Sequence, residues 1–69
     1  MADSIYKVVE LVGTSKVSWE KAAETAIKQA SKSLRDLRIA EVIAMDANIK
    51  NGKIESYRTK LKVSFKFEK

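Results

Sequence analysis

The chain has 69 residues and a mass of 7.8 kDa, which leaves room for one small domain over residues 1–69, because domains usually need about 50 to 200 residues. It contains no cysteine and no histidine, which excludes disulfides and zinc sites built on thiolate or imidazole ligands. The same absences remove the commonest enzymatic nucleophile and general base, so we expect no catalysis. Fourteen basic and nine acidic residues give a net charge of +5, which permits an anionic partner without selecting one.

The N-terminal residues show no secretion signal, since residues 1–4 lack a basic start followed by a long apolar run. No later stretch approaches the roughly 20 apolar residues of a membrane span. We therefore expect a cytoplasmic protein that does not contact membranes.

The first half of the chain predicts a strand and then a helix. Residues 5–12 are rich in β-branched side chains and run into Gly-Thr-Ser at 13–15, which is typical of a strand ending in a turn. Ser18 is a suitable N-cap for the following stretch, in which apolar residues recur at helical spacing from Trp19 to Leu34. The C-terminal part of this helix should carry the basic residues Lys28, Lys32 and Arg35.

The second half predicts a long hairpin, because Asn51-Gly52 between residues 37–49 and 54–67 suits a type I′ turn. If these two residues are the whole loop, Lys50 faces Lys53. Each residue before Lys50 then pairs with the residue the same number of positions after Lys53. One side of the hairpin is then apolar and should face the helix: Ala40, Val42, Ala44, Thr59, Leu61, Val63 and Phe65. The second side carries Ile39, Glu41, Ile43, Met45, Arg58, Lys60, Lys62 and Ser64.

These elements predict an α+β fold in β-α-β-β order, with one helix packed on a three-stranded antiparallel sheet and the last strand in the middle. One helix cannot cover both sides of the sheet, so we expect the second side to meet further copies of the chain. The alternative is scattered surface residues covered by lysine stems. The candidate interface residues are Ile39, Ile43, Met45, Lys60, Lys62, Tyr6 and Tyr57.

Several segments with their spacing resemble the dodecins: YKVVELVGTS at 6–15, SWExAA at 18–23, AEV at 40–42, and Tyr57-x-x-x-Leu61-x-Val63-x-Phe65. The resemblance covers residues 4 to 67 and is strongest to the flavin-silent branch called calcium dodecins. It implies a hollow shell of twelve identical subunits with cubic symmetry. It also implies storage of flavin, whose rings stack between tryptophans of facing subunits and form hydrogen bonds with a glutamine.

Both ligand-binding residues of the family are replaced in this chain. The tryptophan position holds Ile39 and the glutamine position holds Arg58, and our register places both on the second side of the hairpin. Isoleucine offers no flat π surface for stacking, and arginine donates hydrogen bonds but accepts none, although it can hold a phosphate or carboxylate. We therefore expect flavin binding to be weak or absent.

Calcium is the cofactor that the chain could still hold, on oxygen ligands contributed by several subunits. The residues at 46–52 do not match a calcium-binding EF-hand loop, because lysine stands at its fifth position and glycine comes one residue late. The strand acids available for such a site are Glu10, Glu41, Asp46 and Glu55, and the sequence does not choose among them.

Three functions remain open. The first is a dodecin-like homododecamer that binds or stores a small ligand or ion, and the second is a store for flavin such as FMN or riboflavin. The third is a small nucleic-acid-binding module, in which a basic row could follow phosphates. That row has no exposed aromatic residue between its members for base stacking, which counts against nucleic acid as a partner. The members of the row are Arg58, Lys60, Lys62 and Lys66.

Overall fold

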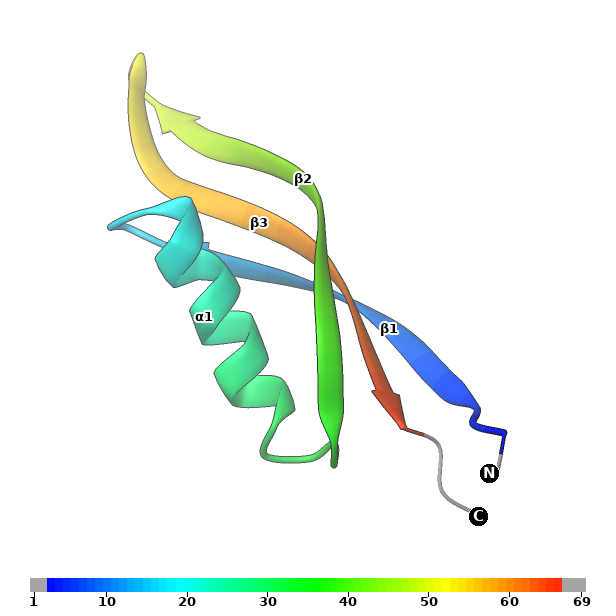
Figure 1. The fold of residues 1–69 in the computed structure, drawn as a ribbon. Coiled ribbons are helices and arrows are strands. Elements are labelled where there is room, and N and C mark those ends of the chain that lie inside the picture. The colour runs from blue at the N-terminus through cyan, green and yellow to red at the C-terminus, as the bar shows by residue number, and fades with distance from the viewer. Residues whose placement is uncertain (1–2, 67–69) are drawn as a thin grey trace.

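The computed structural model describes residues 3–66, and Figure 1 shows their arrangement. The element order is β1 (Tyr6–Ser15), α1 (Trp19–Ala30), β2 (Leu37–Lys50) and β3 (Lys53–Lys66). The three strands form one antiparallel sheet in the order β1-β3-β2. The predicted α+β fold and the central place of the last strand are confirmed.

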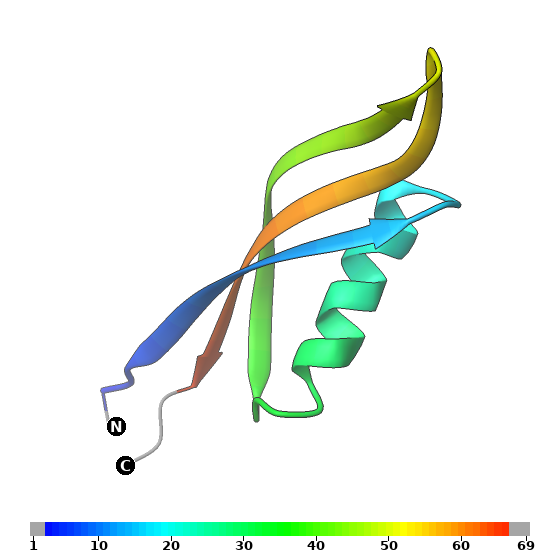
Figure 2. The ribbon, with the colours of Figure 1, turned by 180° about the vertical axis from the view of Figure 1, so that it is seen from behind.

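The sheet is long and bent, and the helix lies against one side of it (Figure 1). Seen from behind in Figure 2, the β2–β3 hairpin extends past the N-terminal end of α1. No element within residues 3–66 covers the opposite side of the sheet, which we call the outer face.

The core lies between α1 and the middle of the sheet. Leu61 and Val63 are fully buried on β3, and they meet the alanine stripe of the helix at Ala26. Burial of a side chain such as Leu61 contributes about 1.5 to 3 kcal/mol. The small alanine side chains let the helix approach β1 and β3 closely, so these two strands contribute the core.

The helix leaves most of β2 uncovered, although Leu37 at its start packs against the core, and here the predicted apolar side was only partly right. Val42 faces the core strand as expected, opposite Leu61, but 49% of its surface is exposed. None of the residues of β2 is buried. Since the sheet bends and α1 packs over β1 and β3, part of the apolar surface on the helix side remains open.

Gly13 lies inside β1 instead of starting a turn, so the prediction that the strand ends before it was wrong. It is buried and pairs with Thr59. A Cβ at this position would overlap the carbonyl oxygen of Ala22 and lie 3.0 Å from the Cβ of Ala26. Glycine is required here because the helix backbone passes directly over the strand.

The helix begins as predicted and ends earlier than predicted. The Ser18 hydroxyl oxygen accepts a hydrogen bond of 3.0 Å from the backbone N–H of Lys21. The helix stops at Ala30, so Leu34 lies in the following turn. Serine-rich residues 31–33 favour a turn, because short hydroxyl side chains compete for backbone hydrogen bonds. Of the three predicted C-terminal basic residues, Lys32 and Arg35 therefore lie beyond the helix, and its last turn holds Lys28.

The tip of the hairpin has the predicted turn. Lys50 faces Lys53, and the two loop residues have positive φ angles, 54° at Asn51 and 73° at Gly52. This is the backbone that a type I′ turn requires. The far end of the predicted strand, Phe67, lies outside the described residues.

Irregularities in the pairing of β2 with β3 change the faces that were predicted for the middle of β2. The first leaves Glu55 of β3 unpaired opposite Asn48 and Ile49, and the second leaves Ile43 of β2 unpaired between Val42 and Ala44. Each one-residue shift moves the following side chains to the other face of the sheet. Met45 was predicted opposite Arg58 on the outer face, but it pairs with Thr59 on the helix side. Ala44 was predicted on the helix side, but it pairs with Lys60 on the outer face.

Candidate functional site

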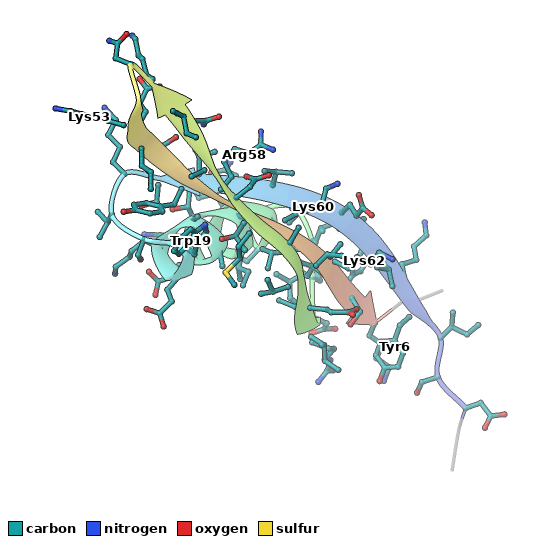
Figure 3. The ribbon with its side chains drawn as sticks, turned by 90° about the horizontal axis from the view of Figure 1, so that it is seen from above. Tyr6, Trp19, Lys53, Arg58, Lys60 and Lys62 are labelled. Atoms are coloured by element: carbon teal, nitrogen blue, oxygen red, sulfur yellow. The ribbon has the colours of Figure 1, made fainter. Side chains whose placement is uncertain are left out.

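The outer face is a mixed polar and apolar surface built by all three strands. Its axis is β3, along which the labelled residues Arg58, Lys60 and Lys62 follow one another in Figure 3. The pairing register places the remaining members on either side. From β1 they are Tyr6, Val8, Glu10, Val12 and Thr14, and from β2 they are Ile39, Glu41, Ala44 and Asp46.

The two positions expected to hold a ligand share this face but are not neighbours. Ile39 pairs with Ser64, whereas Arg58 pairs with Asp46. The two levels are six positions apart along β3, which is at most about 20 Å at the usual rise per residue. One copy of the chain therefore does not bring Ile39 and Arg58 into one pocket, and a site containing both would need two copies.

Arg58 is held by a carboxylate that the sequence did not reveal as its partner. Its Nε donates to Asp46 Oδ1 at 2.7 Å and its Nη2 donates to Asp46 Oδ2 at 3.1 Å. The hydrogen bond from Arg58 lowers the pKa of Asp46, assisted by the charges of Arg58 and Lys60 and opposed by desolvation. The same hydrogen bond and charge raise the pKa of Arg58. The guanidinium is thereby fixed in direction on the outer face.

The lowered pKa of Asp46 gives the ion pair a defined pH dependence. The pair contributes to stability above the ordinary carboxyl value of 3.8, and this contribution is lost as pH falls through the lowered pKa. We expect Asp46→Asn to reduce the unfolding midpoint in urea at neutral pH, with a smaller reduction well below the ordinary carboxyl value. A reduction that is equal at both pH values would contradict the ion-pair assignment.

Trp19 joins the start of the helix to the hairpin. Its indole Nε1 donates to the carbonyl oxygen of Asp46 at 2.9 Å, and its ring meets Tyr57 edge-on at a centroid distance of 4.7 Å. The buried Thr59 hydroxyl donates to the carbonyl oxygen of Trp19 at 2.8 Å. The backbone carbonyl of Asp46 thus binds Trp19 on the helix side of the sheet, while its carboxylate binds Arg58 on the outer face.

The role of this Trp19 contact can be tested by Trp19→Phe, which keeps a ring but removes the indole N–H. We expect a loss of about 1 kcal/mol in the free energy of unfolding, since one hydrogen bond disappears. Urea unfolding followed by circular dichroism measures it. The control is Trp19→Phe combined with Tyr57→Leu, which also removes the edge contact and should cost about 0.5 to 1.5 kcal/mol more. No change in Trp19→Phe would contradict the proposed contact.

All of the predicted interface residues except the half-buried Tyr57 are exposed, but they do not share one face. Tyr6 and Ile39 lie on the outer face, with 51% and 67% of their surfaces exposed. Met45 is 59% exposed on the helix side, and Ile43 lies at the irregularity of β2 with 42% exposed. Tyr57 packs against Trp19, while Lys60 and Lys62 are exposed on the outer face.

The four candidate calcium ligands do not gather in one copy of the chain. Glu10 and Glu41 each pair with Lys62 from opposite sides, and Asp46 is bound to Arg58. Glu55 lies near the hairpin tip, where the pairing shifts. Within residues 3–66, no group of three acidic residues is placed to hold a metal ion. A calcium site built on these residues would need carboxylates from more than one copy.

The predicted basic row is interrupted by acidic residues from both neighbouring strands. Lys62 lies between Glu10 and Glu41, and Arg58 binds Asp46. These acids reduce the positive potential that a phosphate backbone would need.

In the part of the chain that the structure describes, no helix is both long and apolar enough to cross a membrane.

Comparisons with known proteins agree with this architecture. A profile of the dodecin family matches residues 5–68. The calcium dodecin of Mycobacterium tuberculosis is 46% identical over 63 residues, which cover 91% of this chain and 89% of that protein. The dodecin of Thermus thermophilus is 39% identical over 64 residues, which cover 93% of each chain. The predicted resemblance to the calcium dodecin branch is confirmed.

Two solved structures show the same fold. The dodecin from Streptomyces coelicolor superposes with a TM-score of 0.94 at 33% identity, covering 100% of this chain and 99% of that one. The calcium dodecin from Mycobacterium tuberculosis superposes with a TM-score of 0.84 at 45% identity, covering 94% of this chain and 93% of that one. The latter protein is described as a calcium-chelating antigen with a novel calcium-binding site.

Proposed function

This chain belongs to the dodecin family, and on that premise we propose that it is a non-catalytic binding protein. It assembles into a hollow homododecamer that holds a small ligand or ion, and its affinity for flavin is low or absent. The observation that carries this proposal is the pair of side chains at the two positions where the resemblance places the flavin-binding tryptophan and glutamine. Ile39 is an exposed aliphatic side chain, and Arg58 is bound to Asp46.

Assembly is supported by the apolar surface that one copy leaves in water. Ile39 and Met45 are exposed on opposite faces of β2, and full burial of each would contribute about 1.5 to 3 kcal/mol. An apolar groove of about 410 Å³ also runs between β1 and α1, lined in part by Val9, Leu11 and Leu34. Neighbouring copies in closed symmetry can cover all of these surfaces, and a domain of this size gains stability from such contacts.

Low flavin affinity follows from the chemistry of the substituted positions. Ile39 cannot stack on an isoalloxazine ring, and Arg58 cannot accept a hydrogen bond. The bond to Asp46 also holds two of the guanidinium donors. A flavin would have to compete with this ion pair and would gain no stacking in return.

Calcium is the ion that the chain's relatives suggest, since one of them is described as calcium-chelating. Oxygen ligands are the only strong metal ligands in this sequence, which lacks cysteine and histidine. The candidates Glu10, Glu41, Asp46 and Glu55 lie apart in one copy, so we propose that calcium binds between copies. Isothermal titration with calcium should give saturable heat with the assembled protein, and no heat with the dissociated chain.

Assembly is tested by native mass spectrometry, in which we expect about twelve times the chain mass of 7.8 kDa. Ile39→Asp places a charge on the outer face and should reduce the dodecamer to smaller species. The control is Val17→Asp, because Val17 is similarly exposed at 72% but lies in the loop before the helix. A monomeric wild-type protein in dilute solution would overturn the proposed assembly.

Flavin binding is tested on the same assembled protein by the fluorescence of FMN and riboflavin. We expect emission to stay unchanged at micromolar protein, because no aromatic ring is available at position 39 to quench it. Strong quenching would instead favour a flavin store that stacks the ring on another residue. A salt-dependent gel shift of DNA or RNA would favour the nucleic-acid module.

A further inference from the structure

Of the three cations in the middle of the outer face, Arg58, Lys60 and Lys62, all but one have a carboxylate in the facing position of a neighbouring strand. Lys62 has Glu10 on one side and Glu41 on the other. Arg58 has Asp46 on the β2 side and Thr14 on the β1 side. Each of these two cations therefore has at least one carboxylate in the facing position.

Lys60 is the exception. Its facing residues are Val12 on β1 and Ala44 on β2, neither of which carries a charge. Within residues 3–66 it makes no hydrogen bond or ion pair, although its charge contributes to the lowered pKa of Asp46. The middle of the outer face thus holds an unmatched cation two residues along the strand from Arg58.

Arg58 has hydrogen-bonding capacity left beside this cation. A guanidinium carries five N–H donors, and the bond to Asp46 involves only Nε and Nη2. The remaining donors stay in a fixed direction because the carboxylate restrains the planar group. A donor that is already ordered loses less conformational entropy when it binds an anion.

The β1 side of Arg58 offers a neutral donor in addition. Thr14 pairs with Arg58 there, on the opposite side from Asp46. An anionic group lying over the β1–β3 junction would meet Arg58, Lys60 and the Thr14 hydroxyl, with Asp46 on the far side of the strand. Phosphates and carboxylates are recognised by this combination of arginine fork, ammonium and hydroxyl.

We propose that Arg58, Lys60 and Thr14 form an anion subsite on the outer face, which takes the phosphate or carboxylate group of the small ligand. This inference rests on the proposed function, since it names the chemistry of the ligand that the assembled protein holds. On one exposed copy the attraction would be weak and screened by salt. Coverage of the outer face by neighbouring copies lowers the local dielectric constant and strengthens it.

The test is isothermal titration of the dodecamer with inorganic pyrophosphate and, separately, with citrate at low ionic strength. We expect saturable binding of at least one of these anions, and the anion that binds more tightly identifies the group recognised. Lys60→Gln and Arg58→Gln should each weaken binding by about tenfold, since each removes a charged hydrogen-bond donor. Thr14→Val should weaken it by about threefold, because it removes a neutral donor.

Lys28→Gln is the matched control, because Lys28 is an exposed lysine in the last turn of α1 on the other side of the sheet. It should leave anion binding unchanged. The subsite is overturned if the dodecamer binds neither anion, or if Lys60→Gln and Lys28→Gln have equal effects. Native mass spectrometry of every variant separates this failure from the failure of the proposed function, which would appear as a wild-type protein that does not assemble.

Discussion

Gly13→Ala is expected to be among the most disruptive single substitutions in the chain. The added methyl group would overlap the carbonyl oxygen of Ala22, which belongs to the helix backbone and cannot rotate away. The helix would have to move off β1, and with it the alanine stripe that covers Leu61. We expect a loss of about 3 kcal/mol or more, at the upper end of what overpacking usually costs, measured by urea unfolding.

Gly52→Ala is the matched control for this substitution. It adds the same methyl group, but nothing lies within 4 Å of it, and the cost arises only from the positive φ of 73°. Placing an alanine in this left-handed backbone costs roughly 1 to 2 kcal/mol. Equal losses in the two variants would contradict the close approach of α1 to β1.

The elements of the fold could be predicted because each has a local sequence signal. Alternating β-branched residues identify the strands, and the spacing from Trp19 identifies the helix that Ser18 caps. Asn51-Gly52 fixes the turn, and the turn fixes the first pair of the hairpin. These signals depend on residues close together in sequence, so one sequence suffices to recognise them.

The irregularities of β2 had no such signal. A bulge within a run of strand-forming residues such as Val42-Ile43-Ala44 changes no residue type, yet it reverses the faces of Met45 and Asp46. Asp46 therefore appeared as a free carboxylate in the sequence, while the structure bonds it to Arg58. Gly13 was misassigned for a related reason, because the contact that requires it comes from the helix.

The candidate site was predictable in part. The resemblance identified Ile39 and Arg58, and the register of the hairpin correctly placed both on the same side of the sheet. The same register also put Ile39 opposite Ser64, six residues along β3 from Arg58, as the structure has it. It did not predict that α1 leaves most of β2 open, because this depends on the bend of the sheet and on how far one helix reaches across it.

Restoring the family residues should restore flavin binding. We expect Ile39→Trp combined with Arg58→Gln to raise the affinity for FMN by about tenfold or more, because each aromatic pair contributes about 0.5 to 1.5 kcal/mol beyond area burial. Glutamine also supplies a group that both donates and accepts. Quenching of FMN fluorescence, titrated against the assembled variant, measures the gain.

The matched control is Ile39→Leu with Arg58→Gln, which also removes the ion pair between Arg58 and Asp46 but adds no aromatic ring. It should quench FMN no more than the wild-type protein does. Since positions 39 and 58 lie at different levels of one copy, the gain should also disappear when the variant is diluted until it dissociates. An assembled tryptophan variant that does not quench FMN, or a gain that persists in the monomer, would show that the pocket is not formed where two outer faces meet.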